Sequence, residues 1–329
     1  ELDPAAPPAE RHWIQAEESI AYDRNAMTAT ARGRAFCRVY AAEGDEAQMF
    51  SLKGAEKPVG PAPRAPGAPT PWTLKAQEIV ARFSESVDAK TGEKKMDIEH
   101  LTGTRDVHIF SFKDGRENRE ARGGRFEHDA VRKISILPAA ESDPTARAEV
   151  WQGKDWMKSK EIRFEDGEGG GQVTSPTGGI VQFEPKEQAA VDPRAPKGPV
   201  NITCLGPIVF DRRANRISFS RDAVVNQKPA TLKCRELEAF IDPATKTITR
   251  VEGRQEVRFA SESMSGEGNF FEWDVPRRRG YLTGQPQARG RGPDGRWISG
   301  DRVDFELDGQ RVKVGNPVGE NPADGGKWR

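Results

Sequence analysis

Hydrophobic and polar residues alternate with a period of two in many short segments of the chain. The clearest segments begin with a small residue, pass an acidic one and alternate toward an aromatic residue, as in Ala16–Asp23, Cys234–Asp242 and Ser299–Asp308. Similar segments are Ala76–Phe83, Ser159–Asp166 and Ser265–Asp274, with looser versions at Ala121–Asp129 and Cys204–Asp211. Alternation of this kind is typical of β-strands with one buried face. The chain is therefore predicted to be all-β.

Each of these segments is followed by a turn and a second alternating run. Asp242–Lys246 is one such turn, and Met27–Tyr40 and Ile248–Ala260 are second runs. The second runs often cross a glycine, where we expect a bulge or a corner. About eight strand–turn–strand units can be distinguished, and a single unit cannot bury its apolar face alone. The sequence thus predicts an elongated β-solenoid of about eight stacked units.

Stacking would align equivalent apolar side chains into ladders along one interior strip. Neighbouring strands lie ~4.8 Å apart, so each ladder would run the length of the stack. If the two walls of the stack close tightly, the strip is only a core. If they splay apart, it is a groove for acyl chains, whose burial contributes about 0.8 kcal/mol per CH₂. The residues predicted to line the strip are Ile20, Tyr22, Phe83, Ile162, Phe164, Phe210, Phe219, Leu237, Phe240, Ile248, Phe259, Val303 and Phe305.

Composition agrees with a thin architecture that has many turns. Hydrophobic residues make up 35% and charged residues 31% of the chain, with 33 glycines and 24 prolines. Lys+Arg and Asp+Glu balance at 51 each, which gives no argument for a nucleic-acid partner. No run approaches the roughly 18 apolar residues of a membrane helix. Because the sequence opens with Glu1, we expect any signal peptide or anchor to have been removed or to lie outside it.

Two stretches interrupt the repeats. Lys57–Pro71 and Glu184–Pro199 are rich in proline and are predicted to be exposed loops. One continuous solenoid and two jellyrolls placed end to end both remain open. The predicted organisation is an N-terminal extension at 1–12, a first jellyroll half at 13–183, a loop or linker at 184–199, a second half at 200–316 and a C-terminal tail at 317–329.

The chemistry of the chain gives no sign of catalysis. The four histidines have no HExxH or Cys/His spacing around them, so no metal site is predicted, and no nucleophile elbow, P-loop or dinucleotide motif occurs. Acidic residues recur at one repeat position, which favours a structural ladder of stacked side chains over acid–base catalysis. These residues are Glu18, Glu78, Glu161, Glu236 and Asp301. The chain is predicted not to be an enzyme and to need no cofactor.

Two further groups of residues are candidates for specific roles. Arg277, Arg278 and Arg279 form the densest basic run and are either head-group contacts or a solvated turn. Cys204 and Cys234 occupy the same position in consecutive units. If those units are direct neighbours, the Cα atoms would lie within disulfide range, about 4.4–6.8 Å. The alternative is a pair of small inward-facing thiols.

Several segments resemble the OstA-like family, which includes the periplasmic bridge protein of lipopolysaccharide transport. The resemblance is carried by residues 16–40, 234–259 and 280–305, in which Leu282–Gly284 and Ser299–Phe305 match the family's Leu-x-Gly strand and the start of the next unit. The chain looks like a larger, divergent member. The resemblance implies a β-jellyroll with a lipid-lined interior and end-to-end docking of similar domains.

We therefore predict a non-enzymatic carrier that binds the acyl chains of a lipopolysaccharide-like glycolipid between the inner and outer membranes. Its expected location is the periplasm. The expected partners are the glycolipid itself and other jellyroll domains that dock by strand pairing, or further copies of this chain in a homo-oligomer. Two alternatives stay open: a self-assembling structural scaffold, and a polysaccharide-binding or polysaccharide-processing β-helix.

Overall fold

The computed structural model describes residues 13–39, 72–87, 92, 94–113, 116–166, 171–184, 198–245, 247–306 and 311–315. Every regular element in these ranges is a β-strand, which confirms the all-β prediction. A helix with the length and hydropathy for a membrane span is not found among the described residues. The extension predicted at 1–12, the loop at 57–71, most of the loop at 184–199 and the tail at 317–329 lie outside these ranges.

The chain divides into two units. Unit 1 comprises Glu1–Phe183 with Asp211–Arg213, and unit 2 comprises Glu184–Phe210 with Ala214–Arg329. The predicted boundaries of the two jellyroll halves stay a prediction. The strands of unit 1 are β1 (Trp13–Gln15), β2 (Ser19–Asp23), β3 (Thr28–Val39), β4 (Trp72–Val87), β5 (Lys94–Lys113), β6 (Arg116–Asp129), β7 (Ile134–Pro138), β8 (Ala148–Gln152), β9 (Asp155–Ser159), β10 (Glu161–Glu165), β11 (Gln172–Ser175) and β12 (Gly179–Phe183).

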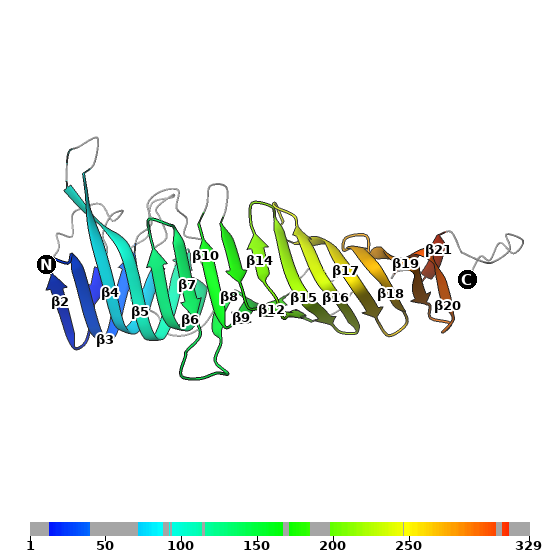
Figure 1. Ribbon diagram of the computed structural model, residues 1–329, viewed down its shortest axis with the longest axis horizontal. Coiled ribbons are helices and arrows are strands. Elements are labelled where there is room, and N and C mark those ends of the chain that lie inside the picture. Colours follow the sequence, from blue (N-terminus) through cyan, green and yellow to red (C-terminus); the bar gives the residue numbers. More distant parts are fainter. Residues whose placement is uncertain are drawn as a thin grey trace, which may run out of the picture. The chain divides into compact units, whose positions relative to one another are not determined.

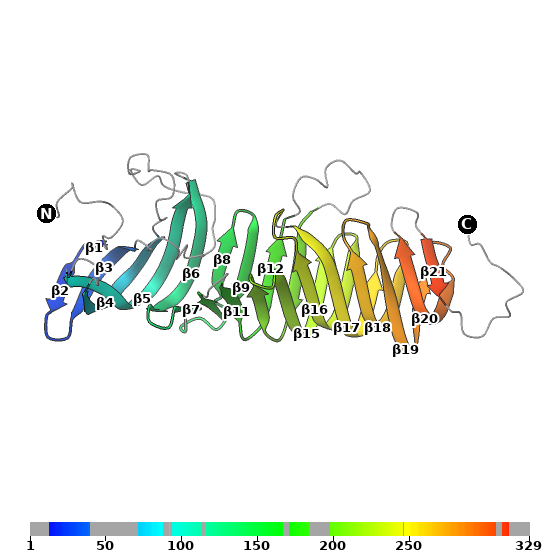
Figure 2. The ribbon, with the colours of Figure 1, turned by 90° about the horizontal axis from the view of Figure 1, so that it is seen from above.

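The strands of unit 2 pair antiparallel in chain order. They are β13 (Val200–Cys204), β14 (Ile208–Asp211, whose last residue belongs to unit 1), β15 (Arg216–Gln227), β16 (Ala230–Ile241), β17 (Ile248–Ala260), β18 (Ser265–Asp274), β19 (Arg279–Arg291), β20 (Trp297–Glu306) and β21 (Arg311–Gly315). The pairs run from β15–β16 through to β20–β21, and β13 pairs with β15. Figures 1 and 2 show β15 to β18 lying side by side.

Each long strand of unit 2 bends once, and the bends align into a corner. The β15–β16 register shifts between Ser220 and Ala223, and corresponding shifts follow in every pair up to β19–β20. A bulge of this kind turns the strand and starts a second wall. We call wall A the arms 223–227, 230–234, 257–260, 265–267, 288–291 and 297–300, and wall B the arms 216–220, 236–241, 248–254, 270–274, 279–283, 302–306 and 311–315.

Unit 1 is built in the same way. Its strands β3, β4, β5 and β6 carry equivalent register shifts, for example between Thr104 and Val107 in the β5–β6 pair. Further along the chain the corner separates β9 from β10 at Lys160, and β11 from β12 at 176–178. There the buried hydroxyls of Ser159 and Ser175 lie 2.5 Å apart, and each donates to the Gly178 carbonyl at 2.6 Å. The Gly178 carbonyl at this corner thereby accepts two hydrogen bonds from buried side chains.

Glycine marks the corner in some strands but not in others. In β3 the expected glycine, Gly33, does turn the chain, with a φ of 76°. In β17, however, the corner lies at Gln255–Glu256, which adopt positive φ, two residues after Gly253. A Cβ on Gly253 would lie 3.3 Å from the Cys234 Sγ of wall A. This glycine therefore makes room for the opposite wall, and the prediction that it forms the corner is wrong.

The candidate site is the apolar interior of each unit

The inner faces of walls A and B in unit 2 meet through apolar side chains. Large side chains of wall B, such as Phe219 and Leu237, and small residues of wall A, such as Ala223 and Cys234, are all buried. Phe305 of wall B faces two glycines, Gly266 and Gly290: a Cβ on either would lie 2.8 or 3.3 Å from its Cζ. Large residues thus fill notches left by small ones, as in a protein core.

Aromatic rings connect the two walls of unit 2. The Phe259 ring of wall A lies 5.8 Å from the Phe271 ring and 5.7 Å from the Phe305 ring, both on wall B. Phe271 also stacks on the half-buried Trp273, with ring centroids 6.2 Å apart. Such contacts are worth about 0.5–1.5 kcal/mol each beyond the area that they bury. These four rings, here called the aromatic bridge, hold the walls together by apolar contacts.

An aromatic cluster in the interior of unit 1 includes the titratable side chain of His128. The Trp72 ring of β4 lies 5.8 Å from Phe126 and 6.0 Å from His128, both of β6. The His128 Nδ1 lies 2.9 Å from the Ser135 hydroxyl. Burial lowers the pKa of His128 below its ordinary value of 6.5, with His100 adding to the shift and Asp129 opposing it. The imidazole is therefore neutral at physiological pH and compatible with an apolar interior.

Seven of the predicted lining residues are buried in these interiors. Ile162 and Phe164 lie in unit 1 on β10, and five more lie in unit 2: Phe219, Leu237, Phe259, Val303 and Phe305. Three others are half-buried: Phe83, Phe210 and Ile248. The structure thus gathers the buried residues of each unit between its own two walls. Their role in binding lipid stays a prediction.

Three predicted lining residues lie elsewhere. Ile20 and Tyr22 are 54% and 50% exposed on β2, which among the described strands pairs with β3 alone, so no further strand covers it. Phe240 lies on the outer face of wall B, because Leu237 and Ala239 point inward and alternate residues of a strand point to opposite faces. The inward-facing positions of β20 that are equivalent to Leu237 and Ala239 of β16 are Val303 and Phe305. Aligning aromatic with aromatic therefore misplaced Phe240 by one residue.

The disulfide prediction is wrong. Thr203, next to Cys204, pairs with Val224 of β15, and Cys234 of β16 pairs with Ala223 of the same strand. Strand β15 therefore lies between the two cysteines, which puts their Cα atoms about two strand spacings apart and beyond bridging distance. They are not bonded to each other, and the Cys204 thiol donates to the Gly206 carbonyl at 3.2 Å. Both side chains are buried, as expected for a pair of small inward-facing thiols.

The three arginines of the basic run lie at the β18–β19 connection. The backbone N–H of Arg277 donates to Asp274 Oδ1 at 2.9 Å, and its guanidinium lies 3.3 Å from Oδ2. Arg278 has a positive φ, and Arg279 begins β19. The run therefore shapes a tight turn, and its contact with a lipid head group stays a prediction.

Two of the recurrent carboxylates form ion pairs among the described residues, Glu78 across the β3–β4 pair and Glu161 within its own strand β10. Glu78 forms an ion pair with Arg32 at 2.9 Å, and Glu161 with Arg163 at 2.6 Å. Groups of His, Cys, Asp and Glu arranged to hold a metal ion are not found among the described residues. Sequence analysis missed Gly266 and Gly290, the two glycines that face Phe305. The signal that could have found them is a glycine at an inward-facing position of a strand.

Comparisons with known proteins add little. No family model matches the chain, and no curated protein matches it. One similar solved structure is LptH, the LptA-homologous periplasmic component of the lipopolysaccharide transport device of Pseudomonas aeruginosa. It shares 16% identity with a TM-score of 0.31, and the match covers 40% of this chain and 79% of that chain. A TM-score this low carries no argument, so family membership stays a prediction.

Proposed function

We propose that the chain is a non-enzymatic lipid carrier that holds the acyl chains of a lipopolysaccharide-like glycolipid between the walls of its units. The observation that carries this proposal is the apolar character of the inner faces. In unit 2 the buried inward side chains are apolar from Ile202 in β13 to Phe305 in β20. The buried charged residue of unit 2 among those described, Glu252, belongs to the outer face, because it pairs with outward Glu238 and Glu272.

An acyl chain would have to replace contacts that the protein now makes with itself. Phe219, Leu237 and Phe305 are each 1% exposed, so the interior is filled. The contacts that must yield are those of the aromatic bridge, in which Phe259 of wall A touches Phe271 and Phe305. Apolar contacts exchange for apolar contacts at little net cost, and each buried CH₂ of the lipid contributes about 0.8 kcal/mol. Separation of the walls about the corner would admit the chain.

End-to-end docking of similar domains is part of this proposal. Strand β2 exposes Ile20 and Tyr22 together with an unpaired edge within the described strands, and such an edge is a template for strand addition. Other jellyroll domains or further copies of the chain would pair there. The periplasm is the compartment in which a carrier between two membranes would work.

Photo-crosslinking tests the proposal. A benzoylphenylalanine placed at Phe305 faces the interior, whereas the same probe at Trp297, an aromatic residue that is 56% exposed on the outer face of wall A, provides the control. After irradiation with short-chain lipopolysaccharide, we expect a lipid-sized mass increase for the Phe305 variant and little for the Trp297 variant. Equal labelling at both positions, or none at Phe305 in a folded protein, would refute an interior lipid site.

The closely packed interior favours a second candidate, a structural scaffold. The glycine notches at Gly266 and Gly290 fit the chain's own Phe305. A scaffold would show no labelling at Phe305 and would assemble in the absence of lipid. Light scattering across a concentration series, run alongside the crosslinking, distinguishes the two candidates.

A further inference from the structure

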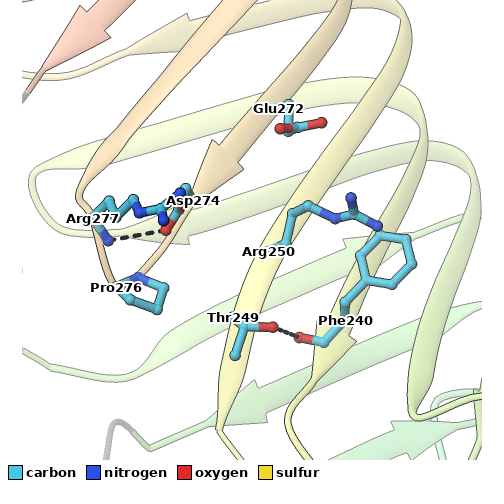
Figure 3. A pocket seen from close by; sticks show the side chains of 7 residues that line it. All are labelled: Phe240, Thr249, Arg250, Glu272, Asp274, Pro276 and Arg277. Carbon is cyan, nitrogen blue, oxygen red and sulfur yellow. Dashed lines mark hydrogen bonds and ion pairs between the residues drawn. The ribbon is translucent and has the colours of Figure 1, made fainter.

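A hollow lies on the outer face of wall B in unit 2, away from the interior. Its volume is about 490 Å³, within the range of small-molecule sites. Figure 3 shows Asp274, Pro276 and Arg277 on one side, and Arg250 and Phe240 on the other. The full lining comprises Phe240, Thr249, Arg250, Glu272, Asp274, Pro276 and Arg277.

The sides of the hollow are held in place by the strands themselves. Arg250 is the cross-strand neighbour of both Phe240 and Asp274, and its guanidinium lies 4.1 Å from the centre of the Phe240 ring. The Thr249 hydroxyl donates to the Phe240 carbonyl at 3.3 Å. On the opposite side, Asp274 fixes the turn through its bonds to Arg277. The hollow is therefore largely preformed.

The two arginines and two carboxylates of the lining balance in formal charge, but they are not all paired with one another. Glu252 and Glu272 are direct cross-strand neighbours, an arrangement in which like charges repel. Glu252 is compensated by Arg250 at 3.3 Å and by Arg254 at 2.6 Å. Glu272, among the described residues, has a neutral partner instead: the Tyr281 hydroxyl, which donates to it at 3.3 Å. Since Asp274 is paired with Arg277, Glu272 is the lining carboxylate that lacks a basic partner at ion-pair distance among the described residues.

The pKa of the Tyr281 phenol is raised in this environment. Burial raises its pKa above 10.0, and the neighbouring Glu272 carboxylate raises it further. Tyr281 therefore stays protonated and donates its hydrogen bond to Glu272. A neutral donor of this kind leaves the negative charge in place for a cationic ligand.

We propose that this hollow is a binding site for a sugar that carries a free amino group. The ammonium would pair with Glu272, while hydroxyl groups would meet the guanidinium of Arg250 and the carboxylate of Asp274. The Pro276 ring and the Thr249 methyl group offer apolar surface to the C–H face of a pyranose. Because Arg250 already covers the Phe240 ring, a flat ligand stacked on that ring fits less well. The site is independent of the interior and of the lipid proposed to occupy it.

Titration calorimetry on the full chain tests this site with three disaccharides that share the same β-1,4-linked pair of glucose-type rings. Fully deacetylated chitobiose carries two amino groups, diacetylchitobiose carries amides, and cellobiose carries hydroxyls alone. A charge-assisted hydrogen bond is worth about 1.4 kcal/mol or more, so the deacetylated sugar should bind at least about tenfold more tightly than the other two. Glu272→Gln should remove that preference. Glu267→Gln, on the wall A arm of the same strand, should leave it unchanged.

Three results would overturn the inference. The first is equal affinity for the three disaccharides, or no binding of any. The second is a preference that survives Glu272→Gln. The third is that 1,4-diaminobutane binds as tightly as deacetylated chitobiose, which would assign the hollow to amines without a sugar. None of these results bears on crosslinking at Phe305, so the two proposals fail separately.

Discussion

Replacing Gly266 with alanine tests whether the walls of unit 2 are as closely packed as the structure shows. By backbone preference alone the change should stabilise the protein, because glycine within a strand costs about 0.5–1 kcal/mol relative to alanine. Gly266 lies in β18 outside the left-handed region, so alanine meets no backbone strain. Packing predicts instead that the change destabilises the protein. The new Cβ would lie 2.5 Å from Leu282 Cδ1, 2.8 Å from Phe305 Cζ and 2.9 Å from the Arg289 carbonyl oxygen.

The packing penalty should exceed the gain in backbone preference. Overpacking a filled core costs about 1–3 kcal/mol, and here one of the crowded atoms belongs to the backbone and cannot rotate away. The three contacts under 3.0 Å place this site in the upper part of that range, about 2–3 kcal/mol, so after subtraction of about 1 kcal/mol for the backbone we expect Gly266→Ala to lower the free energy of unfolding by about 1–2 kcal/mol. The melting temperature should then fall by about 2–8 °C for a unit of this size.

Urea unfolding followed by tryptophan fluorescence measures this change, since Trp273 and Trp297 both belong to unit 2. Gly292→Ala is the matched control, because the nearest atoms to its Cβ would be the Asp294 carboxylate at 3.3 Å and Val312 at 3.8 Å, and neither is closer than 3.0 Å. Its effect should stay within about 0.5 kcal/mol. If Gly266→Ala were neutral or stabilising, the walls would lie farther apart than described, and an open groove would already exist.

Two further predictions concern ionisable groups. Burial raises the pKa of the Cys37 and Cys234 thiols to about 12, so both should react with Ellman's reagent at neutral pH only after unfolding, and rapid labelling of the folded protein would contradict their burial. Burial also raises the pKa of the Glu120 carboxyl, but its hydrogen bond with His108 and the charge of Arg122 outweigh burial and leave the pKa below 4.5. The stability from this carboxylate is thus present above pH 4.5 and lost as the pH falls through the lower folded pKa. Glu120→Gln should flatten the acid limb of a plot of unfolding free energy against pH, and an unchanged limb would refute this assignment.

Much of the fold follows from the sequence because its signals are local. A strand with one buried face must alternate, and turn residues must follow where it ends. The segment at 234–242 alternates and then reaches Asp242, whose Oδ1 accepts hydrogen bonds from the backbone N–H groups of Ala244 and Thr245. Sequence reasoning could therefore predict the strand class, the turn that begins at Asp242 and seven buried residues among the thirteen predicted to line the interior.

Only the tertiary structure determined which face of its strand each residue occupies and which strands lie next to each other. In β16 the inward positions are Leu232 and Cys234 before the corner but Leu237 and Ala239 after it, because the bulge shifts the alternation by one residue. Aromatic content alone could not show that Phe240 faces outward. Strand neighbours are likewise set by pairing between distant segments, which placed β15 between Cys204 and Cys234. The hollow around Glu272 arises from three strands in register, and no single segment of sequence contains that arrangement.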